Sequence, residues 1–210
     1  GMTENAACVT SSHYASAEKE FRFPLDYGNQ RPMSATTTVT GSGAFILSGQ
    51  KSELDYARVT AITIGKIVDL GIRDSMNMGA CMAPAAADTI ERHLRDFQRK
   101  PEDYDRIITG DLGMVGQTAL VDLLQKKGID ITAQHMDCGI EIYDESQDAH
   151  SGGSGCGCAA VTLAALILKK LKEGSYKRVL FVPTGALLSK VSFNEGKSIP
   201  GVAHAVEFAG

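Results

Sequence analysis

The sequence lacks three features that would define its class at once: a long apolar run, an excess of positive charge, and the cysteine spacing of a disulfide-rich domain. None of its apolar runs approaches the roughly 20 residues that a membrane-spanning helix requires, so we expect the chain not to cross a membrane. The net charge of −4, with both signs interspersed, argues against a nucleic-acid partner. Five cysteines, an odd number, favour a reducing compartment, and the start shows no signal-peptide pattern.

What is present is enough apolar material for a full core, since 43% of the 210 residues are hydrophobic. Strand-like and helical segments alternate, which predicts an α/β fold with a sheet covered by helices. The expected strands are residues 6–11 (buried), 39–47, 57–70, 105–109, 140–143, 178–183 and 202–208. The expected helices are residues 84–97, with Pro84 near the first turn, 114–127, and 156–172, which is apolar on nearly all sides and therefore buried.

The most informative motif is a glycine-dense loop, residues 149–158, that leads into the expected helix 156–172. Its glycines allow tight turning and close approach of a ligand or a neighbouring segment. A helix N-terminus offers unpaired N–H groups and a positive dipole, so we expect the amides of residues 152–156 to suit an anion. His150, at the mouth of the loop, is the natural group for proton or anion chemistry. A close-packed turn between strand and helix is the plain alternative.

Three other chemistries are weaker. The loop has neither the dinucleotide-binding spacing nor the Walker ending, so nucleotide binding is poorly supported. A metal site would draw on His135, Cys138, His150, Cys156 and Cys158, but no pair of Cys-x-x-Cys motifs is present, and buried free thiols are the simpler interpretation. Cys156, near a helix N-terminus, could act as a nucleophile with His150, although no third orienting group is evident.

Polar turns follow three of the expected strands, as binding sites do in open α/β sheets. They are Ser11-Ser12-His13, Gly110-Asp111-Leu112-Gly113 and the turn that carries His150. We expect these turns to converge on one pocket. The alternatives are an exposed surface histidine for His13 and a helix N-cap for Asp111.

Residues 149–155, Ala-His-Ser-Gly-Gly-Ser-Gly, resemble the Gly-His-Pro-x-Gly-x-Ser-Gly loop of the thiolase superfamily. Residues 197–206 resemble the last hairpin of that superfamily, where thiolases carry Cys-x-Gly-Gly-Gly. Three stretches, 10–24, 78–86 and 184–201, are more closely similar to a thiolase-like family of stage V sporulation proteins. The similarity recurs in order along nearly the whole chain, so it is far more specific than one motif.

The resemblance implies a layered fold of two similar βαβαβαββ halves. On that template residues 1–50 are the remnant of the N-terminal half, with its last two strands within 6–48, and residues 51–210 are the complete C-terminal half. The nucleophilic cysteine of thiolases would then lie upstream of Gly1. We therefore expect the chain to be a C-terminal portion of a longer protein.

The resemblance also suggests roles for individual residues. His150 falls on the histidine that activates the nucleophile or polarises the thioester, and Ser198 falls near the acid/base cysteine. A serine hydroxyl cannot replace a thiol as a proton donor near neutral pH. Asp111 falls near an asparagine that helps to hold a water in the oxyanion site, and Ser151 replaces the proline of the usual His-Pro.

Members of the sporulation family are regarded as binding proteins, so the resemblance implies a non-catalytic pocket that binds dipicolinic acid and assists its uptake into the developing spore. Histidine, hydroxyl and arginine donors suit this planar dianion. The expected ligand-binding residues are Ser12, His13, Arg22, Asp111, His150, Gly153 and Ser154. No cofactor or metal site is expected, and calcium is left open as a companion of the ligand, with Asp111 as the obvious carboxylate.

The expected partners are other stage V sporulation membrane proteins, with a homodimer at full length. The expected location is peripheral, on the cytoplasmic side of the forespore inner membrane of a Gram-positive spore-former. The alternative is an active thiolase-superfamily acyltransferase or condensing enzyme that uses an upstream cysteine and His150, with Ser198 as a further candidate. A third interpretation is a scaffold in a membrane-bound complex whose pocket is vestigial.

Overall fold

The computed structural model describes residues 4–21, 31–50 and 57–210. Its centre is a five-stranded sheet in the order β4-β11-β8-β5-β6. These strands are β4 (Arg58–Thr63), β5 (Arg106–Thr109), β6 (His135–Asp137), β8 (Arg178–Val182) and β11 (Ala205–Ala209). Strand β5 is parallel to both β6 and β8, whereas β11 is antiparallel to β4 and β8. The predicted α/β class is confirmed.

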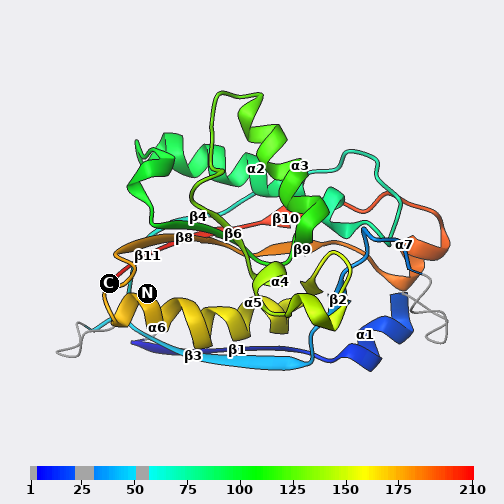
Figure 1. Cartoon of the computed structure of the whole chain (residues 1–210), viewed down its shortest axis with the longest axis horizontal. Helices are drawn as coiled ribbons and strands as arrows, with labels where there is room; N and C mark the ends of the chain where they lie inside the picture. The colour runs from blue at the N-terminus through cyan, green and yellow to red at the C-terminus, as the bar shows by residue number, and fades with distance from the viewer. Residues whose placement is uncertain (1–3, 22–30, 51–56) are drawn as a thin grey trace.

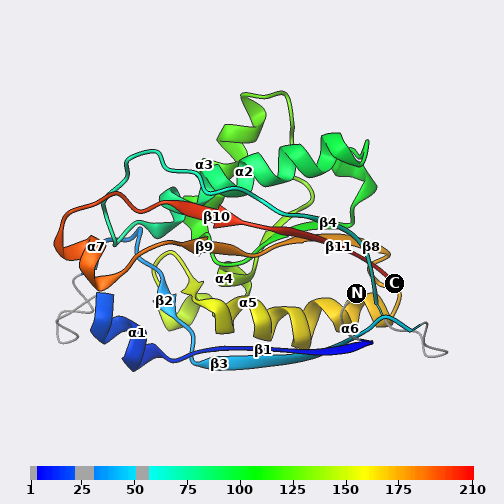
Figure 2. The same ribbon diagram turned by 180° about the vertical axis from the view of Figure 1, so that it is seen from behind.

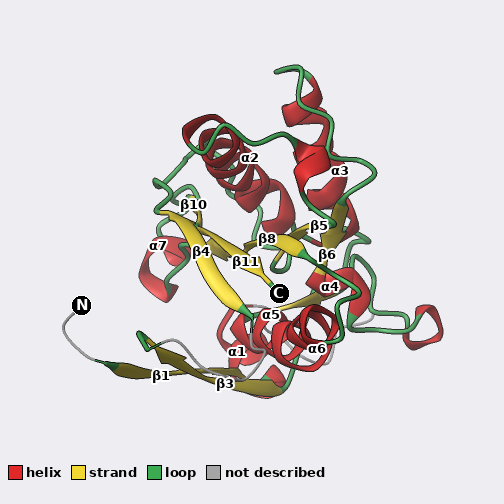
Figure 3. Ribbon diagram, turned by 90° about the vertical axis from the view of Figure 1, so that its left-hand side faces the viewer, coloured by secondary structure: helices red, strands yellow, loops and turns green. Residues whose placement is uncertain are grey.

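Helices cover both faces of this sheet, and a two-stranded ribbon forms a further layer (Figures 1 and 3). The helices are α2 (Met78–Asp96) and α3 (Gly113–Gln125) on one face, and on the other a continuous helix of α5 (Cys156–Thr162), the π-helical turn η4 (Leu163–Ile167) and α6 (Leu168–Lys172). The ribbon pairs β1 (Asn5–Ser12) with β3 (Gly41–Ser48) in antiparallel register and lies on the outer side of α5.

Shorter elements complete the described chain. They are α1 (Tyr14–Phe21), β2 (Thr37–Thr38), η2 (Pro101–Asp103), α4 (Cys138–Glu141), η3 (Glu145–Gln147), β7 (Gly153–Ser154), β9 (Thr184–Ala186), α7 (Lys190–Asn194) and β10 (Gly201–Ala203). Strand β2 is parallel to β7, and β9 is antiparallel to β10. No helix in the described ranges has the length and apolar character that crossing a bilayer would require.

Alternation along the central strands builds two cores, because successive side chains of a strand point to opposite faces. Ile107 of β5 and Leu180 of β8 pack beneath α2 and α3. The next residue on β5, Ile108, packs with Phe181 and with Ile167 of the long helix on the other face. The middle of the sheet, formed by β5 and β8, is therefore buried on both sides, which is why these two strands read as continuous apolar runs.

Glu207 of β11 carries a buried carboxylate, around which several polar side chains of the core gather. It accepts hydrogen bonds from the hydroxyls of Thr60 and Tyr104, each at 2.7 Å, and lies 3.5–3.6 Å from the Nε atoms of Arg178 and Arg99. Burial raises its pKa, but these hydrogen bonds and the two guanidinium groups outweigh burial and leave the pKa below its ordinary value. The side chain therefore stays ionised inside the fold.

Two of the expected elements are wrong. Residues 140–143 are not a strand, because the side chain of Asp137 accepts a hydrogen bond from the Gly139 amide and caps the helix α4 there. The strand before the glycine loop is β6. The helix expected at 84–97 begins at Met78, capped by Asn77, and runs through Pro84 rather than starting at it. A proline inside a helix costs one backbone hydrogen bond, which tertiary packing offsets here.

The first strand is also less buried than expected. Strand β1 forms at residues 5–12, but its outer face is open: Val9 is 71% exposed, and Ile46 beside it on β3 is 74% exposed. The long strand expected at 57–70 is shorter, with ladder pairing over β4 and an isolated bridge from Val68 to Gly201. Helices 114–127 and 156–172 and the strands near 105–109 and 178–183 are confirmed within two residues at each end.

Helices α2 and α3 cross at a pair of glycines. A Cβ atom on Gly79 would lie 2.3 Å from the carbonyl oxygen of Leu112, and one on Gly116 would lie 2.8 Å from the Cα atom of Gly79. Both obstacles are backbone atoms, so no side-chain rotation relieves them. The two helices can approach this closely only because neither residue has a side chain.

We therefore expect Gly79→Ala to separate the helices and lower the free energy of unfolding by about 2 kcal/mol, the usual cost of overpacking a core. Urea unfolding followed by circular dichroism measures this. The control is Gly49→Ala, where a Cβ meets only the carbonyl oxygen of Glu4 at an ordinary 3.7 Å. Equal stability of the two variants would refute the close crossing.

Candidate functional site

The glycine loop, residues 149–158, is anchored by a strand from the first fifty residues. Its strand β7 pairs with β2, with the Thr37 amide donating to the Gly152 carbonyl at 2.8 Å and the Val39 amide donating to the Ser154 carbonyl at 2.9 Å. Strand β2 lies beside the start of α5, at the end of the molecule away from the C-terminus (Figures 1 and 2). The loop is thus held at both ends by hydrogen-bonded structure.

His150 has a left-handed backbone conformation, with φ of +51°. Non-glycine residues adopt this conformation rarely, and strained residues are common at functional sites. Its surroundings fix it: the Gly152 amide donates to the Ala149 carbonyl, and the Ser151 amide donates to the Ala35 carbonyl, each at 2.9 Å. The imidazole is half-buried and forms no hydrogen bond within the described residues. The backbone is constrained, while the ring is free to bind.

Ser151, which stands where the related loops have proline, joins the loop to helix α3. Its carbonyl accepts a hydrogen bond from the Met114 amide at 2.8 Å, and its hydroxyl accepts one from the Val115 amide at 3.2 Å. Two of the first amides of α3 are thereby satisfied. A proline could keep the carbonyl contact but has neither the hydroxyl nor the N–H that bonds Ala35.

Asp111 connects the ends of β5 and β8 to the start of α5. Its carboxylate accepts hydrogen bonds from the Gly155 amide and from the Thr184 hydroxyl, each at 2.8 Å. The N-cap alternative for Asp111 is wrong, because the amides at the start of α3 donate to Asp137 and Ser151 instead. Asp111 is 8% exposed and faces the glycine loop, where it serves as an internal acceptor.

Ser12 ends β1 and His13 follows it, and of these two residues only Ser12 contacts the glycine loop. The Ser12 hydroxyl donates to the Val39 carbonyl at 2.6 Å and accepts from the Gly157 amide at 3.0 Å. It therefore caps the long helix from a neighbouring strand. His13 is exposed, with its Nδ1 atom 3.5 Å from the Ser16 hydroxyl. Of the turns expected to converge, those that carry Ser12 and Asp111 therefore contact the glycine loop directly through hydrogen bonds.

These contacts change the expected anion cradle. Of the backbone amides at 152–156, that of Gly152 donates to Ala149 and that of Gly155 to Asp111. Gly153 is a packing position, where a Cβ atom would lie 2.6 Å from the side chain of Ile142. The Ser154 hydroxyl, in contrast, forms no hydrogen bond within the described residues. Two of the five expected amides, those of Gly152 and Gly155, are therefore already bonded within the protein.

The cysteines do not form a reactive centre. Burial raises the pKa of the thiols of Cys138 and Cys158 well above the ordinary value, and it raises the pKa of Cys81 to about 11. Cys156 is exposed, and its thiol donates to the Ser11 carbonyl at 2.9 Å rather than to His150. Within the described ranges no three ligating side chains are grouped as a metal site would require. The metal alternative, which was already weak from the sequence, thus gains no support from the described residues.

Ser198 lies in the loop before β10, and its hydroxyl donates to the Asp69 carboxylate at 2.6 Å. This hydrogen bond, together with one from the Gly71 amide, lowers the pKa of Asp69. Ser198 makes no hydrogen bond to His150, so the structure does not pair the two residues that an enzymatic role would need. Arg22 lies outside the described residues.

Asp137, at the end of β6, escaped the sequence interpretation although it holds the site together. Its oxygens accept hydrogen bonds from the amides of Leu112, Gly113 and Gly139 and from the Thr109 hydroxyl, at 2.6–3.0 Å. It is 1% exposed, and burial raises its pKa against the effect of these bonds. The only available signal was its position directly after a short strand.

His135 belongs to the same cluster. The Thr109 hydroxyl has one proton, which points to Asp137 at 2.6 Å, so Thr109 accepts the proton of His135 Nε2 at 3.0 Å. Nδ1 of His135 then accepts a hydrogen bond from the side-chain amide of Gln117 at 3.0 Å. This network, from which we assign the tautomer, requires a neutral ring. Burial lowers the pKa of His135 to about 4, in agreement with that assignment.

Comparison with known proteins gives a consistent picture. The family model described as Stage V sporulation protein AD matches residues 1–209. Stage V sporulation protein AD of Bacillus subtilis (strain 168) is 47% identical over 208 residues, covering 99% of this chain and 61% of that protein. The chain thus spans less than two thirds of the length of this curated relative. The similarity inferred from the sequence stretches at 10–24, 78–86 and 184–201 is confirmed.

Solved structures show the same fold at low identity. The tetronic acid condensing enzyme AbyA1 matches with a TM-score of 0.59 and 16% identity, over 100% of this chain and 61% of that one. The 3-oxoacyl-[acyl-carrier-protein] synthase III of Aquifex aeolicus matches with a TM-score of 0.53 and 15% identity, over 99% and 58% of the chains. The chain therefore has an α/β fold resembling condensing enzymes and corresponds to a little over half of each.

The neutral His135 predicts a pH-dependent stability. Its pKa is lowered from 6.5 on folding, so its contribution is complete above about pH 6.5 and is lost as the pH falls toward 4, because the unfolded chain takes up the proton first. We expect the free energy of unfolding to fall by about 2 kcal/mol between pH 7 and pH 5 from this group alone.

Urea unfolding at both pH values, with wild type and His135→Gln, isolates this effect. The variant is expected to lose less stability than wild type on acidification, by about the 2 kcal/mol assigned to the ring. His13→Gln removes an exposed histidine and serves as the control, with the wild-type dependence. An unchanged pH dependence in His135→Gln would exclude the assignment.

Proposed function

The chain belongs to the stage V sporulation protein AD family, and from this premise we propose that it carries the ligand site of a protein that binds dipicolinic acid and assists its uptake into the developing spore. The proposal takes the chain as a binding protein with a thiolase-like fold rather than as a catalyst. The location proposed is peripheral, on the cytoplasmic side of the forespore inner membrane, with other stage V sporulation membrane proteins as partners.

The observation that carries the proposal is the free imidazole of His150. Hydrogen bonds hold the backbone on both sides of His150, and the residue has the strained left-handed conformation. Its ring nevertheless has no hydrogen-bond partner among the described residues. Such strain persists where the surrounding structure enforces it, and it is common at ligand sites. The carboxylates of a pyridine dicarboxylate can accept a charge-assisted hydrogen bond from an N–H of this ring.

The other groups proposed for the site divide into donors and supports. Ser154 brings a free hydroxyl, and His13 is exposed near the end of β1. Ser12, Asp111 and Gly153 support the loop through the contacts described above. The role of Arg22 stays part of the proposal as an expectation. Calcium enters only as a companion that the ligand itself chelates, with Asp111, which accepts the Gly155 amide of the loop, as the proposed carboxylate.

We also propose how the chain relates to the whole protein. The five strands of the central sheet and the three long helices follow one another as strand-helix-strand-helix-strand-helix-strand-strand, which suits a complete C-terminal half over residues 51–210, with residues 1–50 as the end of the N-terminal half. Exposed apolar side chains support this division: Val9 and Ile46 on the ribbon, and Ile62 and Ile64 on and after β4, are 59–74% exposed. An N-terminal half would bury them, and the full-length protein is proposed to form a homodimer.

The competing activity is acyl transfer by an upstream cysteine with His150, as condensing enzymes of similar fold would suggest. Against it stands the hydroxyl of Ser198, which is a poor proton donor and is engaged by Asp69. Incubation of the full-length protein with acyl-CoA, followed by intact mass measurement, separates the two proposals. A covalent acyl adduct would replace the binding function by the catalytic one.

Calorimetric titration of the full-length protein with dipicolinate tests the binding proposal. The variant is His150→Asn, because asparagine tolerates the left-handed conformation that alanine would strain. We expect at least a tenfold loss of affinity, about 1.4 kcal/mol, for removal of one charge-assisted hydrogen bond.

Asp148→Asn is the matched control, since Asp148 is also left-handed (φ +49°), exposed and only two residues before His150. Its affinity should equal that of wild type. Wild-type heats in His150→Asn would remove His150 from the site, and absence of binding by wild type would end the proposal.

A further inference from the structure

Positive charge is concentrated at the end of the molecule opposite the glycine loop. Residues 169–178 contain Lys169, Lys170, Lys172, Lys177 and Arg178 with a single acidic residue, Glu173, in a chain whose net charge is −4. The last turn of α6 and the turn into β8 carry these residues, next to the C-terminus (Figures 1 and 2). We call the four lysines the lysine end.

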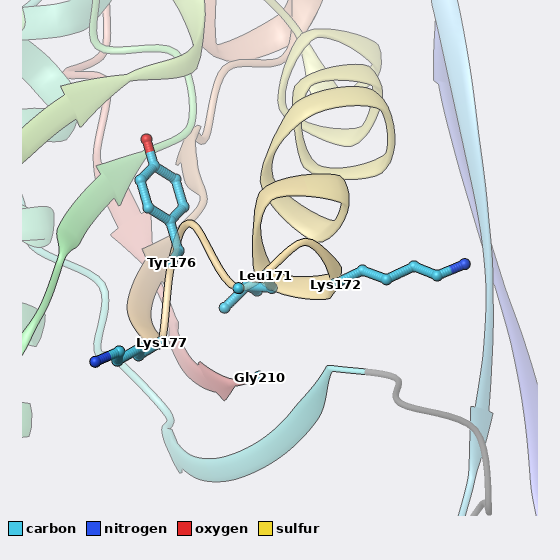
Figure 4. A pocket seen from close by; sticks show the side chains of 6 residues that line it. Leu171, Lys172, Tyr176, Lys177 and Gly210 are labelled. Atoms are coloured by element: carbon cyan, nitrogen blue, oxygen red, sulfur yellow. The ribbon is translucent and has the colours of Figure 1, made fainter.

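A shallow hollow of about 200 Å³ lies at the lysine end, with Lys172 and Lys177 among its lining residues. Leu171, Gly174, Tyr176 and Gly210 line it, and Lys172 and Lys177 extend away from its rim in different directions (Figure 4). On the Tyr176 ring, the ammonium of Lys170 lies 5.1 Å and the guanidinium carbon of Arg106 lies 5.9 Å from the centroid. Four cationic side chains, two on the rim and two against the Tyr176 ring, are thus spread around one hollow rather than converging on a single point.

Internal ion pairing does not account for these lysines. Within the described residues, Lys172 and Lys177 have no ion-pair partner. Lys169 approaches Glu173 at 3.9 Å, but both side chains are more than half exposed, and such pairs contribute little. Arg178 differs, because it is directed inward to Glu207. Asp105, the other nearby acid, accepts the backbone amides of Lys177 and Arg178.

The helix dipole explains only part of the pattern. Cations in the last turn of a helix stabilise it, which suits Lys169, Lys170 and Lys172. Lys177 lies beyond the helix, on the far rim of the hollow, and gains nothing from the dipole. A cluster that exceeds the needs of the fold points to an external partner of opposite charge.

We infer that the lysine end docks on an anionic phospholipid surface. Long, mobile lysines suit the diffuse charge of a membrane, whereas recognition of one phosphate group favours converging arginine forks. The glycine loop would then face away from the bilayer, toward the solution. The inference takes from the proposed function only its membrane location and does not depend on dipicolinate binding.

Sedimentation with vesicles tests the inference. The full-length protein is mixed with vesicles of phosphatidylglycerol and phosphatidylcholine in equal parts, or of phosphatidylcholine alone, at low and high salt. We expect binding to the anionic vesicles only, and release at high salt because surface charge is screened. Each lysine near an anionic surface contributes about fivefold in affinity, so Lys169→Gln, Lys172→Gln and Lys177→Gln together should weaken binding roughly a hundredfold.

The matched control replaces Lys126, Lys190 and Lys197 with glutamine, which removes the same charge from exposed positions elsewhere. This control should bind vesicles like wild type. Equal loss in both triple variants, or equal binding to neutral vesicles, overturns the inference. Binding to polyglutamate but not to vesicles overturns it in favour of an acidic protein partner. Titration of the lysine-end variant with dipicolinate keeps the two proposals separate, because its affinity should be that of wild type.

Discussion

The buried carboxylate of Asp137 is the constraint on which the candidate site depends. It gathers the amides that open α3 and α4 and the hydroxyl that ends β5, so three elements meet at one side chain. Helix starts leave amides without internal partners, and here one acidic residue serves two helices. The glycine loop then rests on this arrangement through Ser151, which satisfies the next two amides of α3.

These internal hydrogen bonds limit which groups of the candidate site remain available to a ligand. Asp111, Ser12 and Ser151 occupy backbone amides that would otherwise attract an external anion. The imidazole of His150, in contrast, has no hydrogen-bond partner among the described residues.

The sequence revealed the α/β class, the long helix from 156 to 172 and the loop, because periodicity and glycine density are local signals. The strand predicted at 140–143 was wrong. The apolar residues around Ile140 are compatible with a strand or a helix, and the side chain of Asp137 caps a helix there. Pro84 suggested a helix start, but packing of α2 extended the helix past it. The role of Asp137 could not be predicted, because its partners lie 2–28 residues away in the sequence and meet only in the fold.

The ribbon of β1 and β3 has a consequence for synthesis. Gly41 and Gly43 of β3 pack closely against Val161 and Ala160 of α5. These α5 residues lie more than a hundred positions later in the chain. During translation the ribbon emerges long before the surface that receives it exists. Contacts of such long sequence separation form late and slowly, and unpaired strand edges stay available to other chains meanwhile. The ribbon can therefore take up its final position only after helix α5 has been synthesised and packed.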